Sequence, residues 1–165
     1  MKFNKAIKNL FIVLFSTLLI SACSTAKKSV DTVDDVYTGT DTVEFLAKGV
    51  PDRIFFATNK SKLTTASRDT LRKQATWMRK NKDVTVTVEG HADERGTREY
   101  NLALGERRAN AAKDYLMTYG VSGKRISVIS YGKERPVNPA SSPLAWSQNR
   151  RSVTVKANYT LLSLL

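Results

Sequence analysis

The alternation of apolar and polar residues after Pro51 predicts four strands. Residues 53–57 (RIFFA) form a short apolar run with β character, and residues 84–88 (VTVTV) alternate strictly, so one face of that strand is expected to be buried. Residues 126–130 (ISVIS) and 152–157 (SVTVKA) show a similar character. These runs have the lengths expected of strands in a small sheet.

Two longer segments between these strands follow a helical period. Residues 64–81 place Leu71, Ala75 and Met78 on one face, and residues 98–119 carry a second apolar stripe. That stripe consists of Leu102, Gly105, Ala109, Ala112, Leu116 and Tyr119. Its small residues predict a close approach to a sheet, and Arg108 is expected at the border between core and water.

The elements therefore follow the order β-α-β-α-β-β, with a loop at residues 132–142 that contains two prolines. Strands that alternate with helices predict a single α+β domain whose helices pack on one face of a sheet. About 105 residues suffice for one modest core.

The N-terminus has a different pattern. Three lysines precede an apolar-to-small run at residues 10–20, which is about half of the ~20 residues that a spanning helix needs. A basic start, a short apolar run and the small residues Ser21 and Ala22 predict a secretory signal peptide over residues 1–22. Ile20–Cys23 (ISAC) resembles a bacterial lipobox, which implies a diacylglycerol thioether and an N-acyl group, such as palmitate, on Cys23.

The rest of the chain divides by composition. Residues 23–50, rich in Ser, Thr, Asp and Lys, are interpreted as the lipidated cysteine and a flexible linker. Residues 51–158 are the predicted folded domain. Residues 159–165 form a tail too short to span a bilayer.

The charge of the chain is strongly positive. It has 27 basic and 15 acidic residues, and without the predicted signal peptide the formal charge is still +9. Such a charge is typical of a solvated basic surface or of a protein with an anionic partner. The chain contains one cysteine and one histidine, which excludes an intrachain disulfide and a zinc site of the usual multi-ligand kind. We expect no metal and no cofactor.

Two opposite charges are candidates for a binding site. Asp93 follows the strand at residues 84–88, and Arg108, fifteen residues later, lies on the helix that returns along that strand. The two side chains are therefore expected to approach each other. A ligand with an ammonium and a carboxylate would suit them, because a guanidinium pairs with a carboxylate in a planar fork. A plain internal salt bridge between the two residues remains the alternative.

The segment VTVEGHADERGTREYNLALGERRANAAKDYL, with ISVISYGKERPV and NRR, resembles the peptidoglycan-associated lipoproteins of the OmpA-like C-terminal domain family. The match covers residues 52–155. The resemblance implies a mixed sheet and non-covalent binding of peptidoglycan through the meso-diaminopimelate of the peptide stem. It also implies a lipid anchor in the outer membrane, a domain in the periplasm, and partners similar to TolB and TolA in a Tol-Pal system that serves envelope integrity and cell division.

Several residues are implied in binding by the same resemblance. Asp93 and Arg108 would hold the free end of the diaminopimelate. Further positions that match the family's pocket are Thr97, Asn101, Leu104 and, as a supporting residue, Arg150.

The chain departs from the family pattern after its first strand. Thr58 and Asn59 stand where the family commonly has Phe and Asp at the pocket. An apolar wall and a negative charge are absent, so stem recognition is expected to be weaker or altered.

Three other functions deserve comparison. Glu89, His91, Asp93 and Glu94 suggest acid–base chemistry, but no nucleophile stands in a recognisable setting, so we expect no enzyme and no catalytic residues. The positive charge suggests nucleic acid, but no nucleic-acid-binding motif is present and a secretory signal separates the chain from that partner. An interaction module for a periplasmic protein, with weak or no peptidoglycan binding, is the third possibility.

Overall fold

The computed structural model describes residues 36–37 and 45–157 of the chain. The predicted signal peptide, Cys23, nearly all of the predicted linker before residue 45 and the tail at 159–165 lie outside the described residues. Among the helices of the described part, none is both long and apolar enough to cross a membrane.

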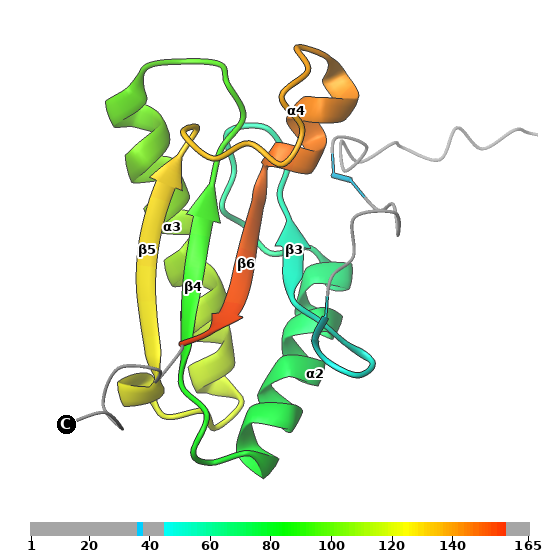
Figure 1. Ribbon diagram of the computed structural model, residues 1–165, viewed down its shortest axis with the longest axis vertical. Coiled ribbons are helices and arrows are strands. Elements are labelled where there is room, and N and C mark those ends of the chain that lie inside the picture. The colour runs from blue at the N-terminus through cyan, green and yellow to red at the C-terminus, as the bar shows by residue number, and fades with distance from the viewer. Residues whose placement is uncertain (1–35, 38–44, 158–165) are drawn as a thin grey trace, which may run out of the picture. The chain divides into compact units, whose positions relative to one another are not determined.

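The described chain alternates strands and helices in the predicted order, with a hairpin added before them and a short helix before the last strand (Figure 1). The strands are Phe45–Ala47 (β1), Val50–Pro51 (β2), Arg53–Phe55 (β3), Val86–His91 (β4), Ile126–Gly132 (β5) and Arg151–Lys156 (β6). The helices are Thr65–Lys80 (α2), Arg98–Thr118 (α3) and Pro143–Asn149 (α4), with a 3₁₀ turn at Gly123–Arg125.

The main sheet has the strand order β3-β6-β4-β5 and is mixed. β4 and β5 are parallel, whereas β6 runs antiparallel to both β3 and β4. Helix α3 packs against β4, β5 and β6, and α2 packs against β3, so the two long helices cover one face of the sheet (Figure 1). The expected α+β class and the helices on one face are confirmed.

The local sequence explains why these elements begin where they do. Thr64 caps α2, because its hydroxyl accepts a hydrogen bond from the backbone N–H of Ser67 at 3.1 Å. The alternation in β4 buries Val86 and Val88 beneath the helices. The core between sheet and helices includes Ile54, Phe56, Leu71, Ala75, Met78, Val86, Val88, Ala109, Ala112, Leu116 and Ile126.

Two glycines set the distance between α3 and the sheet. A Cβ added to Gly90 of β4 would lie 1.9 Å from the carbonyl oxygen of Gly105, and one added to Gly105 would lie 2.9 Å from that of Gly90. The backbones of strand and helix therefore touch at this point, which leaves no room for a side chain. The expected close approach of the small-residue stripe is found here.

The structure differs from the sequence-based expectations in three elements. The predicted linker extends to residue 50, but β1 and β2 form an antiparallel hairpin whose Leu46 is 5% exposed and belongs to the core, so residues 45–50 belong to the folded domain. β4 begins two residues later and ends three residues later than the run at 84–88. The short helix α4 was not predicted; Ser142 caps it and Pro143 occupies its first turn.

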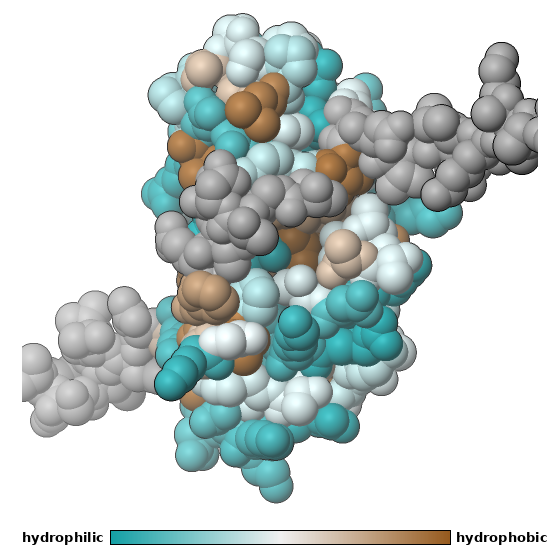
Figure 2. Space-filling view, turned by 90° about the vertical axis from the view of Figure 1, so that its right-hand side faces the viewer, coloured by the Kyte–Doolittle hydropathy of each residue, from teal (hydrophilic) through white to brown (hydrophobic). Residues whose placement is uncertain are grey.

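The strand directions bring four chain segments to one edge of the sheet. β3, β4 and β5 all end at this edge, and β6 begins there, next to α4 (Figure 1). The turn at residues 57–60, the loop at 92–97 and the first turns of α3 therefore meet. On the side seen in Figure 2, the described surface is largely hydrophilic and its apolar residues form separate small patches.

We expect Gly90→Ala to lower the free energy of unfolding by about 2–3 kcal/mol or more, because the methyl group forces strand and helix apart. Gly123→Ala is the matched control, since its methyl group would meet only the flexible end of Met117, at 3.2 Å. Urea unfolding of both variants tests this. Equal effects of the two substitutions would contradict the close-packing account.

Candidate ligand-binding site

Arg108 lies at the centre of the edge where β3, β4 and α3 meet. Its Nε donates to the carbonyl of Lys60 at 2.9 Å, its Nη1 to that of His91 at 2.8 Å and its Nη2 to that of Ala57 at 3.2 Å. The side chain is 0% exposed, so the expectation that Arg108 lies at the border of core and water was wrong. The turn after β3, which is remote in sequence, supplies two of the three acceptors.

The Arg108 guanidinium is buried without a counter-charge in contact. Among the described residues it pairs with no carboxylate, and three carbonyls engage only three of its five N–H groups. Burial and the positive charge of Arg150 lower the pKa of Arg108 to about 10, and the charge of Asp93 opposes this change. The site therefore disfavours its own positive charge and favours an added anion.

Asp93 is also buried, but its carboxylate is paired. Its Oδ1 accepts from the backbone N–H and the Nε of Arg95 at 3.1 and 2.9 Å, and its Oδ2 accepts from Arg95 Nη2 at 2.7 Å. Arg150 Nη1 lies 3.4 Å from the same Oδ2. Burial alone would raise the pKa of Asp93, but the hydrogen bonds from Arg95 and Arg150 outweigh burial and lower it, so the carboxylate is charged at neutral pH.

Asp93 and Arg108 lie in one site but do not form a salt bridge with each other. Arg108 holds the carbonyls of Ala57 and Lys60, while Arg95, bound to Asp93, also donates to the Thr58 hydroxyl at 3.3 Å. Both charges are thus connected to the turn at residues 57–60. The expected approach through the fold is found, and the simple alternative of a direct internal ion pair is not.

Arg150 contacts both Asp93 and the end of β3. Its side chain is 1% exposed, and its Nε donates to the carbonyl of Phe56 at 3.1 Å in addition to the contact with Asp93. Because Arg150 stands between α4 and β6, it connects the last strand to the end of β3.

Further residues predicted at the site lie at the start of α3 or within its first two turns. Thr97 is the N-cap of α3, and its hydroxyl accepts from Tyr100 N at 3.2 Å. Asn101 is 1% exposed and donates to the carbonyl of Arg95 at 2.8 Å. Leu104 is buried in the same helix, one turn before Arg108.

The turn that departs from the family pattern is well formed. Asn59 has φ 56°, a left-handed conformation that Asn tolerates better than most residues, and the N–H of Lys60 bonds back to the carbonyl of Ala57 at 3.1 Å. Asn59 is exposed, and the neighbouring Thr58 is partly buried.

The sequence did not predict that Arg95 and Glu94, beside Asp93, both contact Trp146. Arg95, which is paired with Asp93, has its guanidinium carbon 4.3 Å from the centre of the Trp146 ring in α4. Glu94 accepts from the indole N–H of Trp146 at 2.8 Å and from the hydroxyl of Ser141. Ser142-Pro143 is a helix-start signal that could have predicted α4, but no local pattern places Trp146 of that helix beside the loop at 92–97.

The acidic residues near His91 do not form one catalytic cluster. His91 is 2% exposed and its Nε2 lies 3.5 Å from Glu89 Oε2, whereas Asp93 faces arginines and Glu94 faces Trp146. Within the described ranges, no group of three or more His, Cys, Asp or Glu side chains is arranged to hold a metal ion.

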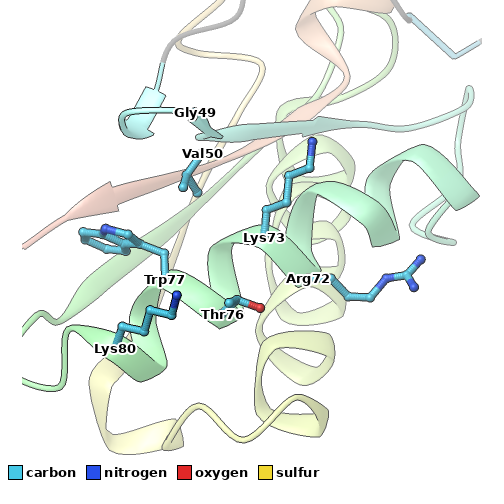
Figure 3. Close-up of a pocket in the computed structure, with 7 residues that line it drawn as sticks. All are labelled: Gly49, Val50, Arg72, Lys73, Thr76, Trp77 and Lys80. Carbon is cyan, nitrogen blue, oxygen red and sulfur yellow. The ribbon is translucent and has the colours of Figure 1, made fainter.

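A pocket of about 510 Å³ lies elsewhere, between α2 and the turn of the β1–β2 hairpin (Figure 3). Trp77 and Val50 form its apolar wall, and basic side chains from α2 stand around it. The basic residues are Arg72, Lys73 and Lys80. None of the residues predicted from the sequence to bind a ligand lines this cavity.

Comparison with known proteins relates the chain to one family. The sequence model of the OmpA family matches residues 55–150, which include Arg108, Asp93 and their partners. The chain is 44% identical to the peptidoglycan-associated lipoprotein of Brucella melitensis over 149 residues, covering 87% of this chain and 89% of that protein. It is 45% identical to the one from Mesorhizobium japonicum over 148 residues, covering 87% and 88%.

A solved structure shows the same fold. The crystal structure of the peptidoglycan-associated lipoprotein from Burkholderia pseudomallei aligns with a TM-score of 0.63 at 32% identity. The alignment covers 64% of this chain and 90% of that one.

The buried His91 predicts a pH dependence of stability. Burial and the charges of Arg151 and Arg135 lower the pKa of His91 to about 3, so the folded chain resists a proton that the unfolded chain accepts below about pH 6.5. We expect the free energy of unfolding to fall by about 1.4 kcal/mol per pH unit as the pH drops from about 6 towards 3. His91→Gln should remove this slope.

Urea unfolding between pH 7 and 5 measures the effect before most carboxylates titrate, and His91 is the only histidine of the chain. The same slope in the parent chain and in His91→Gln would contradict the assignment.

Proposed function

We propose, from the premise that this chain belongs to the OmpA family and to the peptidoglycan-associated lipoproteins within it, that it binds peptidoglycan non-covalently and tethers the outer membrane to the cell wall. The proposed ligand is the meso-diaminopimelate of the peptide stem, whose free end carries both an ammonium and a carboxylate. The chain acts by binding and performs no hydrolysis.

The charge imbalance around Arg108 is the observation that carries this proposal. Three arginines, at positions 95, 108 and 150, share the site with the buried carboxylate of Asp93. A buried charge is costly unless an opposite charge with good hydrogen-bond geometry accompanies it. A ligand carboxylate at Arg108 would supply that partner, and the planar guanidinium suits a carboxylate better than a point charge does.

The ammonium of the same ligand is assigned to Asp93. The carboxylate is held in its charged form by hydrogen bonds, so it can accept a cation across the neutral pH range. Thr97, Asn101 and Leu104 would line the pocket between the two charges. Arg150 positions Asp93, and Thr58 and Asn59 would close the side formed by the turn after β3.

The remaining features of the chain suit a tether. A lipid on Cys23 would anchor the chain, because each buried CH₂ of an acyl chain contributes about 0.8 kcal/mol. The segment from residue 24 to β1 at Phe45 would span tens of ångströms if extended. The domain would then reach the wall from the periplasmic side of the outer membrane.

We further propose that the domain meets TolB-like and TolA-like proteins as part of a Tol-Pal system that serves envelope integrity and cell division.

The basic charge of the chain favours long-range attraction to an anionic polymer such as the cell wall.

Binding of a diaminopimelate-containing stem peptide to the full chain in nonionic detergent tests the site. Asp93→Asn and Arg108→Lys should each weaken binding roughly 30-fold, since the loss of one charge-assisted hydrogen bond costs about 2 kcal/mol. Calorimetric titration measures both. The full chain is required because a fragment that begins at residue 50 would lack β1 and Leu46 of the core.

Arg107→Lys and Asp114→Asn are the matched controls, because these exposed residues of α3 carry the same charges outside the site. Circular dichroism checks that every variant is folded. Binding that survives both site substitutions unchanged would refute the proposal, and muropeptides released from purified sacculi would refute the absence of hydrolysis.

Asn59→Asp should strengthen binding of the same peptide several-fold, because it restores a negative charge beside the ammonium position. Asn59 has φ 56° and is exposed, and Asp tolerates that conformation too, so the substitution should leave the turn intact. An unchanged dissociation constant would show that the departure from the family pattern does not affect recognition.

A further inference from the structure

Arg95 occupies the place that the proposed function gives to the ligand ammonium. Its Nε and Nη2 bind the two oxygens of Asp93 at 2.9 and 2.7 Å, in the two-to-two arrangement typical of a guanidinium and a carboxylate. An ammonium that approaches Asp93 from solvent therefore meets a carboxylate that already holds a cation.

The two arginines bound to Asp93 differ in their freedom to leave. Arg150 is 1% exposed and is fixed to the carbonyl of Phe56 as well. The side chain of Arg95 is 42% exposed, and its second contact on this side is a hydrogen bond of 3.3 Å to the partly buried Thr58 hydroxyl. Arg95 is thus the partner that a ligand can displace, while Arg150 stays.

The backbone beneath Arg95 is held in place while its side chain is at the surface. Asn101 donates to the carbonyl of Arg95 at 2.8 Å, and Lys133 Nζ donates to the carbonyls of Glu94 and Gly96 at 3.2 and 2.8 Å. A change of Arg95 rotamers would therefore open Asp93 without moving the loop. Such side-chain changes are fast in exposed residues.

Arg95 already makes another contact that it can keep when it leaves Asp93. The Trp146 ring lies 4.3 Å from the Arg95 guanidinium carbon, and the indole is fixed by its hydrogen bond to Glu94. A cation can remain over an aromatic face after it leaves a carboxylate.

We infer that Arg95 is a built-in competitor for Asp93, which closes the site in the absence of ligand and weakens binding of the ligand's free amine. This inference rests on the proposed function, because it concerns regulation of the same site. Binding exchanges one cation on Asp93 for another, so the affinity reflects the difference between two ion pairs. Arg95 is 42% exposed, so water can compensate for part of the ion pair that it loses, and the penalty is therefore modest.

The test compares Arg95→Ala with the parent chain, using a stem peptide whose diaminopimelate amine is free and the same peptide with that amine acetylated. We expect Arg95→Ala to bind the free-amine peptide about three- to fivefold more tightly. The acetylated peptide does not compete for Asp93, so Arg95→Ala should not bind it more tightly than the parent does. Arg98→Ala is the matched control: it removes the same charge from an exposed side chain that faces Glu134.

The loss of a positive charge should by itself weaken binding of an anionic peptide. Tighter binding by Arg95→Ala, but not by Arg98→Ala, therefore cannot be a general effect of charge. Suppose that the parent chain binds the free-amine peptide and that Asp93→Asn abolishes this binding. If Arg95→Ala then binds that peptide no more tightly than the parent does, the inference is wrong and the proposed function stands. If neither the parent chain nor Arg95→Ala binds the free-amine peptide, both the inference and the proposed function are wrong.

A second measurement needs no ligand. The pKa of the Asp93 carboxyl, followed by the NMR shift of its carboxyl carbon in the full chain in detergent, should rise in Arg95→Ala and not in Arg98→Ala. A pKa that is equal in the parent and in Arg95→Ala would show that Arg95 does not occupy Asp93 in solution, and the inference would fail.

Discussion

The hydrogen bonds of the Arg108 guanidinium hold together the edge of the sheet at which β3, β4 and β5 end. The guanidinium joins the turn after β3, the end of β4 and helix α3 through three carbonyl oxygens. Without this group, each of the three carbonyls would lose a hydrogen-bond donor, which is most costly for the buried carbonyl of His91. The domain therefore keeps a charge in its interior, and the positions of the surrounding loops follow from the fixed geometry of one side chain.

The same interaction explains why this edge suits an anionic ligand. Carbonyl dipoles stabilise a guanidinium only in part, and the nearest carboxylate, Asp93, is bound to Arg95 and Arg150 instead. The edge thus holds an excess of positive charge in a place that water reaches poorly, where electrostatic interactions are strong. A zwitterion would supply the carboxylate that Arg108 lacks and exchange its ammonium for Arg95 at Asp93.

Close packing and backbone contacts hold most of the domain in place, whereas the inferred change of pairing involves the Arg95 side chain alone. Close contact of Gly90 with Gly105 fixes α3 on the sheet, and the loop before α3 is held by Asn101 and Lys133. Arg95 is the charged group of the site that combines a partner in the interior with an exposed side chain. The core gives stability, and the site can change its pairing without a change of fold.

The sequence by itself determined the order of the main strands and helices, because strict alternation at 84–88 and the helical stripe after Arg98 are local patterns that burial then reinforces. It also indicated that Asp93 and Arg108 would come together, since a helix that returns along its strand must bring them to the same edge. The burial of Arg108 was decided only by the tertiary structure. Its acceptors at Ala57 and Lys60 lie about fifty residues away in the chain, and no local pattern records them. The core position of the β1–β2 hairpin and the meeting of Arg95 with Trp146 depend likewise on segments that are distant in sequence, and only the folded chain brings them into contact.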